Sequence, residues 1–378
     1  MKWLKNIFCL IWLAVTPVLL SASPVILSAS PVLLSASPVL LSASEGSPAT
    51  SSDVDVSEML FGHIGDSYGW HITDWSGGHV TIPLPCIVYS SASGWHAFMS
   101  SKIEHGHAYK GFSLAEDGRY KDKIVEKTAD GTLIRPFDIS ITKNVASLIF
   151  TAILLITLIL WTARWYRRHD AAEEGSPKGF RGLVEMMVMM VNDDIIKESV
   201  GPHYRKYAPY LLTAFFFIFI SNLLGIVPFF PGGANVTGNI AVTFVLAACS
   251  FFAVNMFADR HYWKEILWPD VPLFLKFPLP LMQMIEIFGM FTKPFSLMVR
   301  LFANIMAGHA MILGLVSVIF VTAKLGPVIN GSMTVVTMLF GVFMDCLELL
   351  VAFIQAYVFT MLSGVFIGMS RQGDKEIL

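Results

Sequence analysis

The chain has 378 residues, of which 54% are hydrophobic and only 14% are charged. A soluble domain usually carries about 25% charged residues, so this composition excludes a disordered chain, a basic nucleic-acid-binding protein and an ordinary cytosolic enzyme. The formal net charge of −2 gives no reason to expect a nucleic acid or another polyanion as a partner. We therefore expect a membrane protein, and the positions of its few charges should indicate its function.

Residues 1–44 combine an export signal with a short repeat. Lys2 and Lys5 precede an uncharged run over residues 7–20, and small residues follow, which is the order of a secretory signal. The unit Ser-Ala-Ser-Pro-Val-(Ile/Leu)-Leu then repeats over residues 21–41. Because each proline would cost a helix about 3 kcal/mol, the repeat is a poor spanning helix. We predict a cleaved signal, and a retained anchor is the alternative.

Residues 45–140 have a different composition, with mixed charges and frequent glycine and tryptophan. Alternating stretches at residues 79–88 and 132–142 predict short strands. Six of the ten histidines fall here, but their spacing matches no metal-ligand pattern, and the four cysteines form no CxxC pair. We expect a small exported β-rich domain without a metal or cofactor.

Residues 141–378 are predicted to form a membrane channel domain that contains about five membrane segments. The first segment, residues 145–162, is followed by Arg164, Arg167 and Arg168. The positive-inside rule places that end in the cytoplasm and the preceding domain outside. With about five segments, this topology leaves the N-terminal domain outside and the C-terminus in the cytoplasm.

Residues 179–198 carry methionine and aliphatic side chains at helical spacing, with charged residues between them. This pattern predicts an amphipathic helix at the inner membrane surface or against a partner. A loop helix packed on its own protein is the alternative.

Two charge-free segments follow, at residues 208–227 and 239–257. The turn between them has no lysine or arginine, which fits an outside position. The next loop, residues 259–280, carries Arg260, Lys264 and Lys276 and fits an inside position.

The last two apolar segments, residues 285–323 and 332–369, are too long for an ordinary span. As a continuous helix each would measure about 57 Å, whereas the hydrocarbon core is about 30 Å thick. An unbroken helix would then lie about 58° from the membrane normal, and ordinary spanning helices tilt by about 20°. We therefore expect two helices that are either steeply tilted or kinked.

These two segments also contain charged groups at membrane depth. An arginine there costs at least about 2.5 kcal/mol and must face protein or water. Lys293 can reach the inner surface, and Glu286 lies close to it, but Arg300 has no such escape. The polar residues of the two segments are Glu286, Lys293, Arg300 and His309 in the first, and Asp345, Glu348 and Gln355 in the second.

Helix arithmetic brings some of these residues together. Suppose that Gln355 packs beside Arg300. His309 then lies about 14 Å outward of Arg300 along one helix, and Glu348 lies about 10 Å outward of Gln355 along the other, so His309 and Glu348 have similar depth. Asp345 precedes Glu348 by three residues and shares its side of the helix. The sequence thus predicts an acid–histidine cluster in the outer half of the membrane and a permanent cation near the middle.

Residues 293–309 read KPFSLMVRLFANIMAGH, and residues 355–359 read QAYVF. Over about residues 179–370 the chain resembles subunit a of the F-type ATP synthase. The Arg-Leu-Phe-x-Asn core, the following glycine and the downstream Gln-Ala are the most specific part. The resemblance implies an all-α polytopic membrane protein whose last two helices, long and strongly tilted, face a rotating ring of c subunits.

The resemblance also implies roles for individual residues. Arg300 matches the essential arginine opposite the ring carboxylate, with Asn304 and Gln355 as its polar neighbours. Glu286 matches an acid of the inner access path.

His309 stands where many bacterial members of the family have Glu, and Glu348 stands where they have His. The exchange keeps one acid and one imidazole at the same depth, which suits proton relay. Asp345 belongs either to this path or to a solvated outer funnel. Structural readings stay open, since Arg300 could form an ion pair and the His309 pair could clamp two helices.

The implied function is proton translocation by two offset half-channels that serve the c-subunit ring. The other implied partners are subunit b of the peripheral stalk, the rest of the F1F0 complex and the lipid bilayer. The chain has no GxxxxGK[ST] phosphate loop, so nucleotide chemistry belongs to the partners and the chain itself is not an enzyme. The sequence leaves open whether protons or sodium ions are coupled.

Two other classes of protein use charged groups in membranes. A secondary cation/proton antiporter normally shows internal inverted repeats and more spans, and none is visible here. An intramembrane hydrolase needs a Ser/His arrangement, an aspartate pair or a zinc motif such as HExxH, and no such motif appears.

Overall fold

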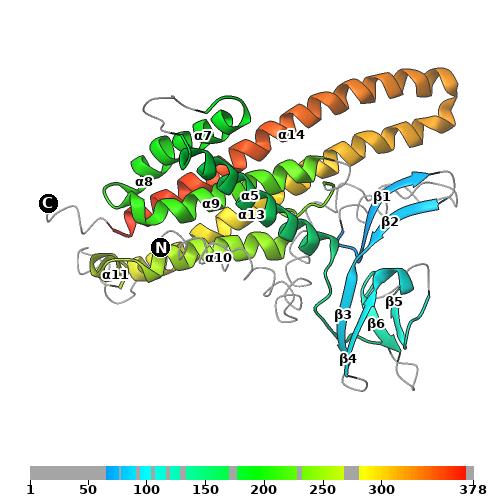
Figure 1. Cartoon of the computed structure of the whole chain (residues 1–378), viewed down its shortest axis with the longest axis horizontal. Coiled ribbons are helices and arrows are strands. Elements are labelled where there is room, and N and C mark those ends of the chain that lie inside the picture. The colour runs from blue at the N-terminus through cyan, green and yellow to red at the C-terminus, as the bar shows by residue number, and fades with distance from the viewer. Residues whose placement is uncertain are drawn as a thin grey trace.

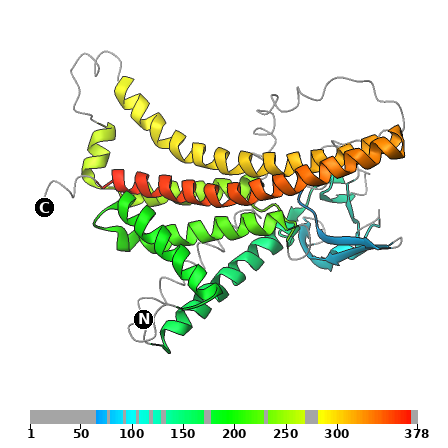
Figure 2. The same cartoon turned by 90° about the horizontal axis from the view of Figure 1, so that it is seen from above.

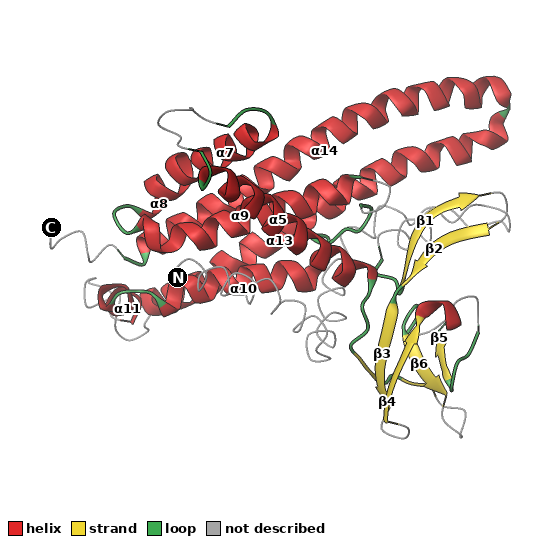
Figure 3. Ribbon diagram, in the orientation of Figure 1, coloured by secondary structure: helices red, strands yellow, loops and turns green. Residues whose placement is uncertain are grey.

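A computed structural model describes residues 65–75, 78–90, 94–103, 107–115, 120–127, 133–169, 177–227, 232–267 and 281–371. In this part of the chain a β-rich N-terminal unit precedes an assembly of helices (Figures 1 and 3). The predicted signal and repeat at residues 1–44 lie outside the described residues. So do residues 45–64 of the predicted exported domain and residues 268–280 of the predicted inner loop.

The N-terminal unit contains three small antiparallel sheets, β1-β2, β4-β3-β8 and β5-β6-β7. Its core is formed mainly by Cys86, Val88, Phe98, Phe112 and Ile124. The prediction of a β-rich N-terminal region is therefore confirmed. The strands are β1 (Gly69–Trp75), β2 (Gly78–Pro83), β3 (Pro85–Ser90), β4 (Gly94–Met99), β5 (Phe112–Leu114), β6 (Ile124–Lys127), β7 (Leu133–Ile134) and β8 (Phe137–Asp138).

Hydrogen bonds fasten this unit to the first long helix, α5 (Lys143–Tyr166). The Asp66 carboxylate accepts a hydrogen bond from the backbone N–H of Asn144 at 3.1 Å, and the carbonyl of Ser67 accepts one from the N–H of Lys143 at 2.8 Å. Both bonds satisfy N–H groups that a helix start leaves without a partner. Burial raises the pKa of the Asp66 carboxyl, because the surroundings disfavour its charged form.

The five apolar segments predicted from the sequence all form helices. By length and composition, four helices of the described region can cross a membrane, and α10, with 17 residues, is a shorter apolar helix. The chain is thus a mostly helical, polytopic membrane protein. After α5 come α7 (Phe180–Met190), a π-helix (Val191–Lys197), α8 (Glu198–Val200), α9 (Tyr204–Ile226), α10 (Ile240–Met256), α11 (Arg260–Leu267), α13 (Leu281–Thr322) and α14 (Pro327–Met369).

The last two helices are continuous and antiparallel. They contain 42 and 43 residues, which corresponds to about 63 Å, twice the thickness of the hydrocarbon core. Figure 2 shows the beginning of α13 curving away from α14, and Pro294 lies in this part of the helix. Proline removes one backbone hydrogen bond and pushes on the preceding turn, which accounts for the bend. A straight helix of this length would have to cross a bilayer obliquely to stay within it, and α13 is in addition bent.

Helix α9 lies at the centre of the helical core. Its residues Leu211, Phe215 and Ile218 are fully buried, and Phe359 of α14 belongs to the same cluster. This burial explains why α9 shows no amphipathic pattern in the sequence.

The predicted amphipathic helix at residues 179–198 forms α7 and the π-helix. Ile195 and Ile196 of the π-helix are buried in the core of the chain, whereas Met186 and Met189 of α7 are exposed. The second half of this segment therefore packs on its own protein, as the alternative interpretation expected. The placement of α7 at the inner membrane surface stays a prediction.

Candidate functional site

Arg300 lies on an exposed side of α13 and is itself exposed. Among the described residues it has no ion-pair or hydrogen-bond partner. Ala303, Asn304 and Ala307, three, four and seven positions farther along the helix, are exposed as well. This spacing places them on the same side of α13 as Arg300. Arg300 is therefore exposed among short side chains on this side of α13.

One turn beyond Arg300, Asn304 connects α13 to α14. Its side-chain amide donates a hydrogen bond to the side-chain oxygen of Gln355 at 2.7 Å, and Gln355 is buried. Gln355 thus lies close to the arginine, but its partner is the neighbouring asparagine. The bond fixes the relative position of the two long helices at this level.

Farther along the same two helices, His309 Nδ1 lies 2.6 Å from Glu348 Oε1. Glu348 is buried, and in the described part of the chain neither of its oxygens nor His309 Nδ1 makes a hydrogen bond of good geometry, so the contact is a close ion-pair approach. The juxtaposition expected from helix arithmetic is present. A carboxylate and an imidazole at this distance can share or exchange a proton, because each offers a titratable site to the other.

Two glycines leave room for this pair. A side-chain carbon built on Gly308 would lie 3.1 Å from Glu348 Oε1, and one built on Gly225 of α9 would lie 3.8 Å from the His309 ring. Gly308 thus allows the carboxylate to approach the backbone of α13 closely. Gly225 leaves the imidazole in ordinary contact with α9.

A set of buried polar residues near this pair was not singled out in the sequence. Asn222 of α9 accepts a hydrogen bond from Thr237 at 2.6 Å and donates one to the backbone carbonyl of Ala352 at 3.4 Å. The Asn235 amide lies 3.7 Å from the sulfur of Met306. Asn222 within a charge-free apolar segment was the signal that could have identified this set, since a buried amide needs partners.

Asp345 lies outside the His309–Glu348 contact. It is exposed on α14, and no described residue forms an ion pair or hydrogen bond with it. Glu286, near the beginning of α13, is partly buried and faces the region of α11. Burial raises the pKa of Tyr262 in α11, and the Glu286 charge adds to the effect.

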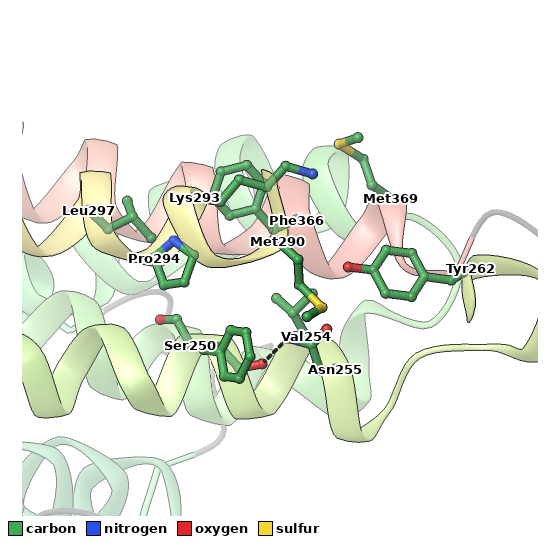
Figure 4. Close-up of a pocket in the computed structure, with 11 residues that line it drawn as sticks. Ser250, Val254, Asn255, Tyr262, Met290, Lys293, Pro294, Leu297, Phe366 and Met369 are labelled. Atoms are coloured by element: carbon green, nitrogen blue, oxygen red, sulfur yellow. Dashed lines mark hydrogen bonds between the residues drawn. The ribbon is translucent and has the colours of Figure 1, made fainter. Parts of the chain in front are cut away.

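A small pocket lies between α10, α11, α13 and α14 (Figure 4). Its lining includes Asn255, Tyr262 and Lys293 among apolar side chains. The Lys293 ammonium lies 5.6 Å from the centre of the Phe366 ring. This arrangement keeps Lys293 within the chain, in contrast to Arg300.

The site thus contains an exposed cation, an amide pair and a buried acid–imidazole pair on two adjacent helices. In the described residues no group of three or more His, Cys, Asp or Glu side chains could hold a metal ion.

The sequence family described as "ATP synthase A chain" matches residues 145–368. The chain belongs to this family. The match covers more than half of the sequence and also includes α5, which lies before the residues on which the resemblance was recognised. The resemblance of this chain to subunit a of the F-type ATP synthase, predicted from its sequence, is confirmed. A second match, residues 59–144, is to a domain of unknown function.

Similar proteins bear the name ATP synthase subunit a. The protein from Chloroherpeton thalassium is 38% identical over 62% of this chain and 67% of its own length. A protein from Prosthecochloris aestuarii, named ATP synthase subunit a 2, is 37% identical over 75% of this chain and 88% of its own length. The protein from Myxococcus xanthus is 38% identical over 62% of this chain and 73% of its own length. These matches do not favour an antiporter.

Proposed function

We propose that this chain is the proton-translocating stator subunit of a rotary F-type ATP synthase in a bacterial inner membrane. As a member of the ATP synthase A chain family it is a multi-pass, non-catalytic subunit that takes part in proton transport and ATP synthesis. The finer proposal is that two offset half-channels lead protons to and from a ring of c subunits.

The exposed and unpartnered guanidinium of Arg300 is the observation that carries this proposal. An unpaired cation at membrane depth is costly, so it requires an anion or water. In the described part of the chain no acid lies against it, whereas the short side chains around it are exposed. A carboxylate on a neighbouring subunit satisfies both requirements.

The mechanism follows from the energetics of that carboxylate. Facing lipid it must be neutral, because a bare carboxylate in hydrocarbon is expensive. Beside Arg300 the positive charge lowers its pKa, and it releases its proton. Because Arg300 separates the two half-channels, a proton crosses the membrane only when the ring carries it around. Each charge that crosses about 100 mV supplies about 2.3 kcal/mol for rotation.

We assign His309 and Glu348 to the outer half-channel, together with Asp345 at its exposed mouth. The buried contact of 2.6 Å between imidazole and carboxylate supports this assignment. Glu286 is assigned to the inner half-channel, since it lies at the opposite end of α13 beside the charged helix α11. In this orientation the N-terminal domain is periplasmic and the C-terminus is cytoplasmic.

The proposed partners are the c-subunit ring, subunit b of the peripheral stalk and the remainder of F1F0. The similar proteins named ATP synthase subunit a support this assembly.

The test is the substitution Arg300→Ala in the assembled complex. We expect ATP-driven proton pumping into membrane vesicles to be abolished, because the ring carboxylate loses the charge that makes it release its proton. Lys293→Ala is the matched control, since it also removes a cation from α13. Unlike Arg300, the Lys293 ammonium lies over the ring of Phe366 within the same chain. The control should retain most of the pumping.

Full pumping by the Arg300→Ala variant would overturn the proposal. Equal loss in both variants, with normal assembly, would show that any cation on α13 is needed and would remove the special role of Arg300.

A further inference from the structure

The sheet β4-β3-β8 has a buried face and an uncovered face. On the buried face Cys86 and Val88 are fully buried, and Phe98 stacks on Phe112 of the neighbouring sheet. Because side chains alternate along a strand, the intervening residues point to the other face. That face contains Ile87, Tyr89, Trp95, Ala97, Met99 and Phe137, and it is called the aromatic face below.

Three aromatic rings form a row across the aromatic face. Tyr89 is directly opposite Trp95 on one side and Phe137 on the other. Their exposed fractions are 41%, 60% and 38%, and the rings of Tyr89 and Trp95 lie 5.0 Å apart. An antiparallel sheet with one face in water normally carries polar side chains on that face. The aromatic face has no charged side chain, so it is suited to a partly apolar environment.

The sheet is held beside a membrane helix. Strand β8 ends at Asp138, and α5 begins at Lys143, only a few residues later. Two hydrogen bonds, which Asp66 and Ser67 accept from backbone N–H groups, tie the unit to the first residues of α5. The aromatic face therefore cannot move far from the point where α5 enters the membrane.

The position of the sheet indicates what the aromatic face meets. In Figure 1 strands β3 and β4 run across the direction of α9 and α10, beside the N-terminal end of α5. Strands β5 and β6 lie on the side of them away from the helices, and they cover the buried face. The aromatic face is consequently turned toward the side of the membrane helices.

We propose that the aromatic face lies in the headgroup region of the bilayer beside the N-terminal end of α5. Tyrosine and tryptophan prefer this region, because their rings are apolar and their O–H and N–H groups remain hydrated. Since the aromatic face carries no charged side chain, docking does not require anionic lipids. The occupant is thus a zwitterionic lipid surface, and the N-terminal domain is a membrane-resting module whose matched family has no assigned function.

The test uses the full chain in phosphatidylcholine vesicles, with the native cysteines replaced. A nitroxide label is attached through Ala97→Cys, in the centre of the aromatic face, and in a matched variant through Ala108→Cys. Ala97 and Ala108 are both exposed, but Ala108 adjoins Tyr109, which packs on the buried face. Collision of each label with an aqueous nickel chelate and with lipid-soluble oxygen is then measured.

The proposal predicts that the Ala97 label is several-fold less accessible to the nickel chelate than the Ala108 label, and more accessible to oxygen. Equal access of both labels to the chelate would show a water-exposed face and would overturn the proposal. Shielding of the Ala97 label from both reagents would show a protein cover, either residues 1–64 or another copy, and would overturn it as well.

A second pair of variants separates docking from folding. Trp95→Ser, with the label at Ala97→Cys, should increase access of the chelate to the label, because the largest interfacial side chain is lost. Ser101→Ala, an exposed change on the segment after β4, should leave the access unchanged. No increase in the Trp95→Ser variant would contradict a lipid contact through the aromatic row.

Discussion

His309 Nδ1 lies 2.6 Å from Glu348 Oε1, and this contact joins α13 to α14. The acid is buried, and the glycine at position 308 gives it space against the backbone of α13. A buried carboxylate is tolerated when a partner shares its proton or its charge. In the proposed function this pair passes a proton between water and the region of Arg300.

Exchange of the two residues tests whether the pair works as a unit. His309→Glu alone places two carboxylates in contact, so one must stay protonated and proton flux should fall strongly. The double change with Glu348→His restores one acid and one imidazole. We expect the double variant to pump protons better than His309→Glu. Strictly additive losses in ATP-driven pumping would contradict direct coupling.

Gly308→Ala tests the close approach of the carboxylate. The added methyl group would lie 3.1 Å from Glu348 Oε1, so the acid must shift by a fraction of an ångström. Since a displacement of about 1 Å can cost about 100-fold in rate, we expect up to about a tenfold fall in proton pumping with normal assembly. Gly314→Ala, which meets open space on the same helix, is the control. Equal pumping by both variants would refute a positional requirement for Glu348.

Gly368→Ala tests the packing of the end of α14. The new methyl group would meet the backbone carbonyl oxygen of Ser199 at a distance that no real contact shows. Because backbone cannot swing aside, we expect a loss of about 1–3 kcal/mol. Thermal unfolding of the full chain in detergent measures this loss. Gly341→Ala, which meets nothing within 4 Å, should unfold at or above the wild-type temperature.

Asp66→Asn tests the junction between the β-rich unit and α5. Burial raises the folded-state pKa of Asp66 above its usual 3.8. The protonated Asp66 therefore contributes fully to the folding stability below about pH 3.8, and this contribution is lost as the pH rises through the raised pKa. Asparagine keeps the oxygen that accepts the Asn144 N–H but cannot ionise. We therefore expect the variant to equal the wild type near about pH 4 and to exceed it at neutral pH. The measurement is thermal unfolding of both proteins across this pH range. A stability difference between Asp66→Asn and the wild type that shrinks as pH rises would contradict the prediction.

Several features of the structure could be predicted from the sequence because they depend on local periodicity or on fixed geometry. The apolar segments and the short strands follow from hydrophobic patterns. The contact of His309 with Glu348 follows from the constant rise of a helix, which sets relative depth once two antiparallel helices are paired.

Other features depend on how each helix is rotated about its own axis and on packing between segments that are far apart in the sequence. Helix arithmetic gives depth but not which side chains meet, so the hydrogen bond between Asn304 and Gln355 could not be derived from it. Three residues turn a helix by about 300°, which leaves Asp345 about 60° away from Glu348 and explains its exposure. The π-helix at Val191–Lys197 and the buried Asn222 depend on contacts between distant segments.

The most direct test of the central claim is a cross-link between the Arg300 side of α13 and the c-subunit ring. Ala303→Cys lies on the same side as Arg300 and is exposed, and its partner is a cysteine beside the ring carboxylate, with the native cysteines of this chain replaced. We predict that oxidation forms the cross-link and stops ATP-driven proton pumping, and that reduction restores it. The same reaction with Ile153→Cys, an exposed position on α5, should form no cross-link. A cross-link from Ile153 but not from Ala303 would contradict the account.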